Sequence, residues 1–121
     1  MHRLLLAAAV IATLSSVARA QAIDVTLTEW KVELSRDTVH AGPVTFHVTN
    51  KGTITHGFYV RGNGVAKGAK EMAPQEPQTL TVSLKPGTYE VYCPVSDLSH
   101  RAAGMTHKLV VVAAESTTKK P

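Results

Sequence analysis

The stretch "TLTVSLKPGTYEVYC", residues 79–93, alternates apolar and polar residues on either side of the turn sequence KPG at 85–87. Alternation with a period of two predicts β-strands that bury one face, and Pro-Gly predicts a tight turn, so the stretch indicates a β-hairpin. In its second half, Tyr89, Val91 and Cys93 fall on one face of the strand. Because successive side chains point to opposite faces, this parity places Cys93 on the core side, at the end of a strand.

The same alternation extends over much of the chain and predicts an all-β protein. The apolar residues change parity between Leu27 and Trp30, which predicts a bulge or jog near Thr28 and Glu29. Residues 61–78 are rich in Gly, Lys and Pro, and we expect them to form a long loop. Together the segments predict a β-sandwich of about seven short strands. The further alternating segments are residues 23–28, 30–35, 44–50, 55–60 and 107–114.

The first 20 residues, "MHRLLLAAAVIATLSSVARA", have the composition of an export signal. A basic start is followed by an apolar stretch at about 4–14 and by the A-x-A pattern of Ala18 to Ala20. We expect cleavage after Ala20 and a periplasmic or secreted protein. A retained anchor is the alternative, but the apolar stretch is shorter than the roughly 20 residues that span a bilayer. We therefore expect no stable membrane insertion after the signal is removed.

The sequence after Ala20 predicts a single small domain at 21–114, followed by a polar tail at 115–121. Removal of Arg3 and Arg19 leaves 11 Lys and Arg against 9 Asp and Glu. This small excess does not form the clustered basic surface that nucleic-acid binding requires, so we exclude nucleic acid as a partner. We expect a monomer.

Cys93 is the only cysteine of the chain, which is unusual for an exported protein because such proteins normally pair their cysteines. Three interpretations remain open for it: a buried inert thiol, an intermolecular disulfide or a metal thiolate. A buried thiol is the commonest of these in general. The residues expected to lie near Cys93 distinguish these three interpretations.

Two histidines and a methionine are predicted to lie near Cys93. In "HGFYV", residues 56–60, parity places His56 on the core face at the start of a strand. The loop "PVSDLSHRAAGM", residues 94–105, would return His100 and Met105 to the same pole of the sandwich. A thiolate, two imidazoles and a thioether form the ligand set that selects copper, with a weakly bound axial methionine.

With these residues in view, the chain resembles the cupredoxins, the small blue copper proteins of the plastocyanin, azurin and sulfocyanin type. The resemblance lies in "TEWKVELSRDTVHAGPVTFHVTNKGTITHGFYV", "LKPGTYEVYCPV" and "HRAAGM". It implies a Greek-key β-sandwich that binds one type 1 copper ion. It also implies the ligands His56, Cys93, His100 and Met105, with Met105 axial.

Three positions depart from common cupredoxin patterns. His100 comes seven residues after Cys93, whereas the family's spacing is more often three to five, so "SDLS" resembles an insertion. Gly57 stands where many members have an asparagine that ties the first histidine's strand to the cysteine loop, and we expect looser support there. Asp97 stands where the binuclear copper domain of terminal oxidases has a second cysteine, so the resemblance favours a mononuclear site.

The remaining histidines and one methionine are weaker candidates. His47 lies on the polar face of its segment, His40 in a turn and His107 at the start of the last strand. We expect all three at the surface rather than at a metal. Met72 lies in the predicted long loop and would reach a metal only if that loop folded over the site.

The resemblance implies an electron carrier rather than an enzyme. In cupredoxins the second histidine reaches the surface through an apolar patch, which here would surround His100. Expected partners are a c-type cytochrome and a terminal oxidase or reductase. The first alternative is a protein that buffers or delivers copper without electron transfer, and the second is a metal-free adhesion or assembly module. The expected patch residues are Pro94, Val95, Leu98, Ala102 and Ala103, with Arg101 at the rim.

Overall fold

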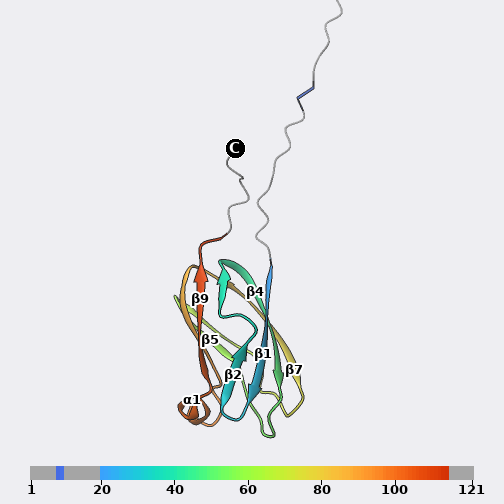
Figure 1. Ribbon diagram of the computed structural model, residues 1–121, viewed down its shortest axis with the longest axis vertical. Helices are drawn as coiled ribbons and strands as arrows, with labels where there is room; N and C mark the ends of the chain where they lie inside the picture. The colour runs from blue at the N-terminus through green and yellow to red at the C-terminus, as the bar shows by residue number, and fades with distance from the viewer. Residues whose placement is uncertain (1–7, 10–19, 115–121) are drawn as a thin grey trace, which may run out of the picture.

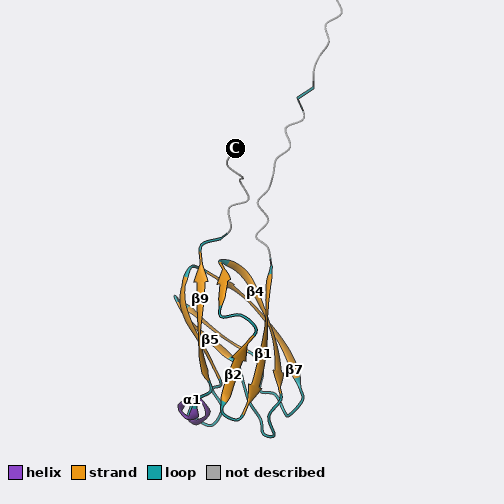
Figure 2. Cartoon of the chain, viewed as in Figure 1, coloured by secondary structure: helices purple, strands orange, loops and turns teal. Residues whose placement is uncertain are grey.

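The structure, a computed structural model, describes residues 8–9 and 20–114. Within these residues the chain forms nine β-strands and one short helix (Figures 1 and 2). Most of the predicted signal peptide and the whole predicted tail lie outside the described residues. The elements are β1 (Gln21–Thr28), β2 (Lys31–Leu34), β3 (Thr38–His40), β4 (Gly42–Asn50), β5 (Tyr59–Gly62), β6 (Val65–Gly68), β7 (Pro77–Leu84), β8 (Gly87–Tyr92), α1 (Ser99–Ala103) and β9 (Thr106–Val112).

The strands form two sheets, and the predicted all-β sandwich is confirmed. One sheet has the strand order β2-β1-β4-β7 and the other has the order β3-β9-β8-β5-β6. Both sheets are mixed, because β1 pairs with β4 in parallel and β3 pairs with β9 in parallel. In Figure 1, α1 lies at the pole opposite the one at which β1 starts and β9 ends. We call the end with α1 the α1 pole.

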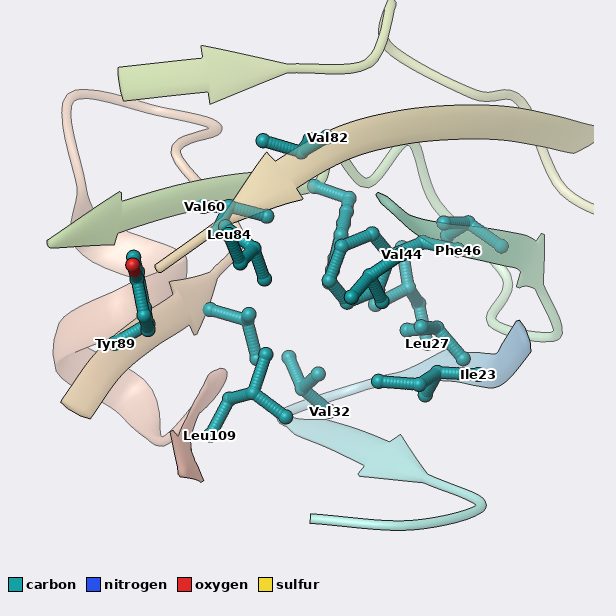
Figure 3. Close-up of a cluster of buried hydrophobic side chains, with 14 of the residues drawn as sticks. Ile23, Leu27, Val32, Val44, Phe46, Val60, Val82, Leu84, Tyr89 and Leu109 are labelled. Carbon is teal, nitrogen blue, oxygen red and sulfur yellow. The ribbon is translucent and has the colours of Figure 1, made fainter. Parts of the chain in front are cut away.

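The core lies between the two sheets and is built from the alternating apolar residues (Figure 3). Ile23 and Leu27 of β1 are fully buried, as is Phe46 of β4. The Phe46 ring packs against that of Phe58, with ring centroids 5.2 Å apart. Burial of each such side chain stabilises the fold by roughly 1.5–3 kcal/mol. The period-two parity therefore predicted correctly which side chains these strands bury.

The predicted hairpin at residues 79–93 is wrong. β7 pairs with β4, whereas β8 pairs with β5 and β9, so the KPG turn connects one sheet to the other. The Tyr89 hydroxyl donates to the Lys85 carbonyl at 2.7 Å and accepts from the Lys85 amide at 3.1 Å. These two bonds hold the corner at which the chain changes sheets. Alternation identifies the buried face of a strand, but it carries no information on the neighbouring strand.

We expect Tyr89→Phe to lower the free energy of unfolding by about 1–2 kcal/mol, because the corner loses two hydrogen bonds while the ring stays buried. Urea unfolding of the metal-free protein measures the change. Tyr59→Phe is the matched control, since the Tyr59 hydroxyl makes no hydrogen bond among the described residues. Equal stability of the two variants would contradict this role for Tyr89.

Residues 61–78, which were predicted to form a loop, contain the end of β5, the whole of β6 and the start of β7. β5 and β6 form a hairpin that pairs Gly62 with Val65. Asn63 and Gly64, the two residues between them, have positive φ angles of 43° and 76°. Asn-Gly favours this hairpin turn because both residues tolerate left-handed backbone. With β3 and β6 added, the described residues hold nine strands rather than about seven.

The predicted bulge near Thr28 and Glu29 is instead a chain reversal. Thr28 of β1 pairs with Lys31 of β2 in an antiparallel ladder, so Glu29 and Trp30 form a two-residue turn joined by a cis peptide bond. The change of parity arises because a new strand begins, and not because one strand is kinked. As a result Trp30 lies outside the core, with 45% of its surface exposed.

Candidate metal centre

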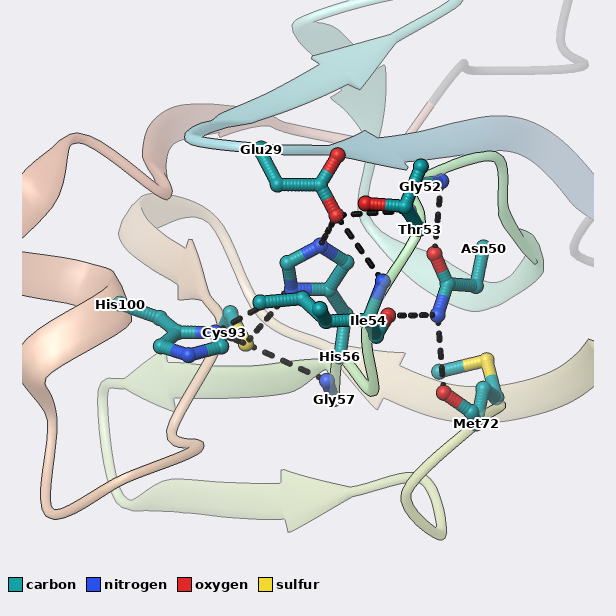
Figure 4. Close-up of polar contacts among 10 residues, drawn as sticks. All are labelled: Glu29, Asn50, Gly52, Thr53, Ile54, His56, Gly57, Met72, Cys93 and His100. Atoms are coloured by element: carbon teal, nitrogen blue, oxygen red, sulfur yellow. Dashed lines mark hydrogen bonds and ion pairs between the residues drawn. The ribbon is translucent and has the colours of Figure 1, made fainter. Parts of the chain in front are cut away.

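Three predicted ligands converge at the α1 pole. His56 lies between β4 and β5, Cys93 directly follows β8, and His100 lies in α1. The two Nδ1 atoms of His56 and His100 are 3.2 Å apart. Cys93 Sγ lies 3.9 Å from Nδ1 of His56 and 3.7 Å from Nδ1 of His100. Figure 4 shows the two imidazoles beside the thiol.

The triangle formed by these three atoms has the size that one metal ion requires. Bond lengths of about 2.0 Å to imidazole and 2.3 Å to thiolate, typical of zinc sites, give trigonal edges of about 3.5 Å between nitrogens and about 3.7 Å from sulfur to nitrogen. The observed edges are 3.2, 3.7 and 3.9 Å. The same three residues are the group of described side chains that could hold a metal ion. One ion fits without a rearrangement of the backbone.

Cys93 is completely buried, and its position follows from strand parity. The Gly57 amide donates to Cys93 Sγ at 3.2 Å. Burial raises the pKa of the Cys93 thiol, and the Gly57 N–H opposes this shift. In the absence of a metal the thiol is therefore protonated and shielded at neutral pH. A metal cation beside it would favour the thiolate.

His100 is held by a loop with an unusual backbone. Ser96, Asp97 and Leu98 all have positive φ angles, of 58°, 49° and 67°, and α1 begins at the next residue. Left-handed backbone costs roughly 1–2 kcal/mol for each ordinary residue, and strain of this kind is concentrated at functional sites. The lengthened part of the loop thus forms a left-handed turn that leads into the helix carrying His100.

The expected exposed edge of His100 is not what the structure shows. His100 is 6% exposed, and the Trp30 ring packs against it edge to face, with ring centroids 4.9 Å apart. Burial lowers the pKa of His100, and nearby His56 lowers it further. The imidazole is therefore neutral at neutral pH, as a metal ligand must be.

His56 is fixed from two sides. Its backbone forms a two-way bridge with Met72, with N···O distances of 3.1 and 2.8 Å. Its Nε2 lies 3.0 Å from Glu29 Oε1, which leaves Nδ1 directed at Cys93 and His100. The pKa of Glu29 is lowered to about 2, chiefly because its carboxylate accepts a hydrogen bond from the Thr53 backbone. The carboxylate is consequently ionised throughout the physiological pH range.

Asn50 organises the turn that precedes His56. It is completely buried, and its side-chain amide donates to the carbonyls of Ile54 and Met72, both at 2.8 Å. Its Oδ1 accepts from the Gly52 amide at 2.8 Å. One side chain therefore joins the turn after β4 to the segment that bridges His56 (Figure 4).

Met105 is brought to the same pole. Its carbonyl accepts from the Cys93 amide at 3.1 Å, and its own amide donates to the His100 carbonyl at 3.1 Å. The side chain is fully buried. Met105 is thus tied through its backbone to two of the converging residues.

The weaker candidates do not join the donor triangle. His47 is exposed, and His107 Nδ1 lies 3.2 Å from the Val32 carbonyl. The backbone amide and carbonyl of His40 bond to the Gln21 side chain. Met72 contacts His56 through its backbone, and in Figure 4 its side chain lies away from Cys93.

Gly57 follows His56 in place of the asparagine that many cupredoxins have there. Close packing between Gly57 and the Cys93 loop, together with other side chains, provides the support that the asparagine would give. A Cβ at position 57 would lie 3.2 Å from Pro94 and 3.4 Å from Val95, so glycine lets the two ligand segments approach. The support for the first histidine comes instead from Glu29 and Asn50, which the sequence analysis did not identify as site residues. The parity change at residues 27–30 was the signal that could have drawn attention to Glu29 and to Trp30.

Comparison with known proteins agrees with the fold. The family model of the cupredoxin-like domain matches residues 2–111. The chain belongs to this cupredoxin-like family. Its fold and its His, Cys, His, Met donor set fit one type 1 copper ion. No curated protein matches the chain in sequence.

Solved structures share the fold at low sequence identity. Dithionite-reduced auracyanin from Roseiflexus castenholzii has a TM-score of 0.66 at 19% identity, over 76% of this chain and 97% of that one. Auracyanin A, a blue copper protein from Chloroflexus aurantiacus, has a TM-score of 0.65 at 18% identity, over 78% of this chain and all of that one. Blue copper oxidase from Nitrosomonas europaea has a TM-score of 0.61 at 16% identity, over 85% of this chain and 41% of the oxidase. The fold therefore occurs in blue copper proteins and in multicopper oxidases alike.

Proposed function

We propose that this protein is an exported electron carrier with one type 1 copper ion bound by His56, Cys93, His100 and, axially, Met105. The observation that carries the proposal is the triangle of two imidazole nitrogens and one cysteine sulfur, with edges of 3.2, 3.7 and 3.9 Å. Copper bound there would supply a one-electron Cu(II)/Cu(I) couple. A thiolate with two imidazoles and a weak axial thioether is the arrangement of electron-transfer copper sites.

Burial of the site supports a carrier rather than an enzyme. His56, Cys93 and Met105 are fully buried and His100 nearly so. A catalytic metal centre keeps a coordination position open to its substrate, whereas a closed site favours outer-sphere electron transfer. The extensive backbone and side-chain support around His56 would also limit rearrangement when the copper changes its oxidation state.

An apolar surface at the α1 pole supports transient docking. Of the four large exposed hydrophobic residues in the described part of the chain, three lie near the histidines, namely Trp30, Ile54 and Leu98. Trp30 packs on His100, while Ile54 and Leu98 each lie two residues from a predicted ligand. A small apolar contact with weak charge steering suits a carrier that must release its partner after each transfer. A c-type cytochrome and an oxidase or reductase would meet this surface, with Trp30 rather than the His100 edge outermost.

We expect Trp30→Ala to increase the rate at which a Cu(I) chelator removes copper several-fold, because the indole covers His100. The apolar shell around a metal site controls access to it. Stopped-flow absorbance after chelator addition measures the rate. Leu98→Ala is the control. Leu98 is as exposed as Trp30, but it has no aromatic ring that could pack against a histidine as Trp30 does. Unchanged removal from Trp30→Ala would contradict the covering role.

Export and the monomeric state are parts of the same proposal. No helix among the described residues is long and apolar enough to cross a membrane. β1 begins at Gln21, the residue after the expected cleavage point. The Gln21 side chain bonds to the backbone of His40, with distances of 2.6 and 2.8 Å. Cleavage after Ala20 would therefore leave the first strand intact.

The experiment for the proposal uses residues 21–121 with added Cu(II). A carrier gives an intense thiolate-to-copper charge-transfer band, a reversible one-electron potential and rapid electron exchange with a c-type cytochrome. Copper uptake without reversible cycling would instead support metal buffering or delivery. If the protein bound no copper, both electron transfer and copper delivery would be excluded. The remaining candidate would be a metal-free adhesion or assembly module.

A further inference from the structure

We propose that Glu29 is a positioning residue for the copper site: it holds His56 through Nε2, so that Nδ1 faces Cys93 and His100, and its negative charge lowers the reduction potential of the bound copper. This inference rests on the proposed function. It concerns a residue outside the predicted ligand set, placed beside the site by the turn between β1 and β2.

The geometry fixes both the carboxylate and the imidazole. Glu29 Oε1 accepts hydrogen bonds from the amides of Thr53 at 2.7 Å and Ile54 at 3.2 Å, and it lies 3.0 Å from His56 Nε2. An ionised carboxylate can only accept, so Nε2 must carry the hydrogen. The lone pair of His56 then resides on Nδ1, the atom that forms the triangle with Cys93 and His100. A carboxylate on the outer nitrogen of a metal-bound histidine also increases its basicity.

Gly52 packs tightly against the contact between the Glu29 carboxylate and the His56 imidazole. Gly52 is buried, and a Cβ at this position would overlap Glu29 Oε1 and lie 2.8 Å from His56 Nε2. Only glycine leaves room for both groups. The turn after β4 therefore encloses the carboxylate–imidazole pair from one side while its amides at Thr53 and Ile54 orient the carboxylate.

The charge of Glu29 would act on the copper couple. Among the described residues, the Glu29 carboxylate forms no ion pair with a lysine or arginine; it is hydrogen-bonded to His56. Reduction lowers the positive charge of copper by one, so a fixed negative charge nearby stabilises the oxidised state more than the reduced state. The Glu29 side chain is 27% exposed, and water therefore screens part of this effect.

Three variants separate the two roles. Glu29→Gln keeps an oxygen that can accept the same N–H bonds but removes the charge. Glu29→Ala removes both the charge and the acceptor. Glu33→Gln, the control, removes one carboxylate that pairs with Lys31 at the surface. Each variant is examined without metal by imidazole ¹⁵N chemical shifts, and with copper by its potential and visible spectrum.

For the charge, we expect Glu29→Gln to reduce the Cu(II)/Cu(I) affinity ratio about tenfold, which raises the potential by about 59 mV for one electron. Its charge-transfer band should persist. A potential for Glu29→Gln equal to that of Glu33→Gln would overturn the charge role.

For the position of His56, we expect the metal-free wild type and Glu29→Gln to hold the proton on Nε2, and Glu29→Ala to show a mixture of tautomers. An unchanged tautomer in Glu29→Ala would overturn the positioning role. This measurement needs no copper, so it stands even if the wild type forms no thiolate band. A missing band in the wild type would sink the proposed function, whereas a normal wild-type band with unshifted variants would sink only the inference on Glu29.

Discussion

Replacing Cys93 by serine is expected to abolish the visible thiolate-to-copper charge-transfer band and to weaken copper binding roughly a hundredfold or more. Cys93 supplies the only thiol of the chain, and its Sγ forms two edges of the donor triangle. Loss of a residue that merely supports a ligand already costs 10–100-fold in metal affinity, so loss of the soft ligand itself should cost at least as much. Copper titration followed by absorbance measures both quantities.

His47→Ala is the matched control for this experiment. It removes an imidazole from the exposed face of β4, where no part of the triangle lies. We expect it to keep the wild-type band and affinity. A band that survives in Cys93→Ser would show that the colour does not arise from a copper thiolate, and the assignment of Cys93 as a ligand would fail.

Replacing Asn50 by alanine is expected to destabilise the metal-free protein by about 3 kcal/mol. Asn50 makes three hydrogen bonds to the backbone of the turn after β4 and of the His56 bridge. Each contributes about 1 kcal/mol, and the partners left without a hydrogen bond in a buried site add to the loss. Urea unfolding of the metal-free chain measures the change, so the result does not depend on copper.

Two further variants sharpen the Asn50 test. Asn50→Asp keeps the acceptor for Gly52 but loses the two donated bonds, and we expect it to be destabilised at least as much because it also buries a charge. Lys51→Ala, at the exposed neighbouring position, should change stability by less than about 0.5 kcal/mol. If Asn50→Ala behaved like Lys51→Ala, the turn would not depend on this side chain.

The strain in the ligand loop explains why one part of the site could not be predicted. Spacing showed that His100 is unusually far from Cys93, but not where the extra residues would go. Three successive left-handed residues, Ser96, Asp97 and Leu98, occur there without a glycine among them. They lie in the loop whose two ends are fixed by the pairing of β8 with β9 at Tyr92 and Thr106, and the closure of this loop over α1 selects their backbone.

The sequence by itself determined which faces the strands bury, since alternate residues of a strand point to the same face and the apolar ones identify the buried face. It also predicted the chemical identity of the donors, because a cysteine, two histidines and a methionine form a copper-selective set. It could not determine that β7 and β8 belong to different sheets, because pairing depends on contacts between segments far apart in the chain. The placement of Glu29 at His56 and of Trp30 on His100 was likewise decided by tertiary structure. A reversal between β1 and β2 carries both residues to the α1 pole, and only the packing of that turn against the histidines gives them a role there.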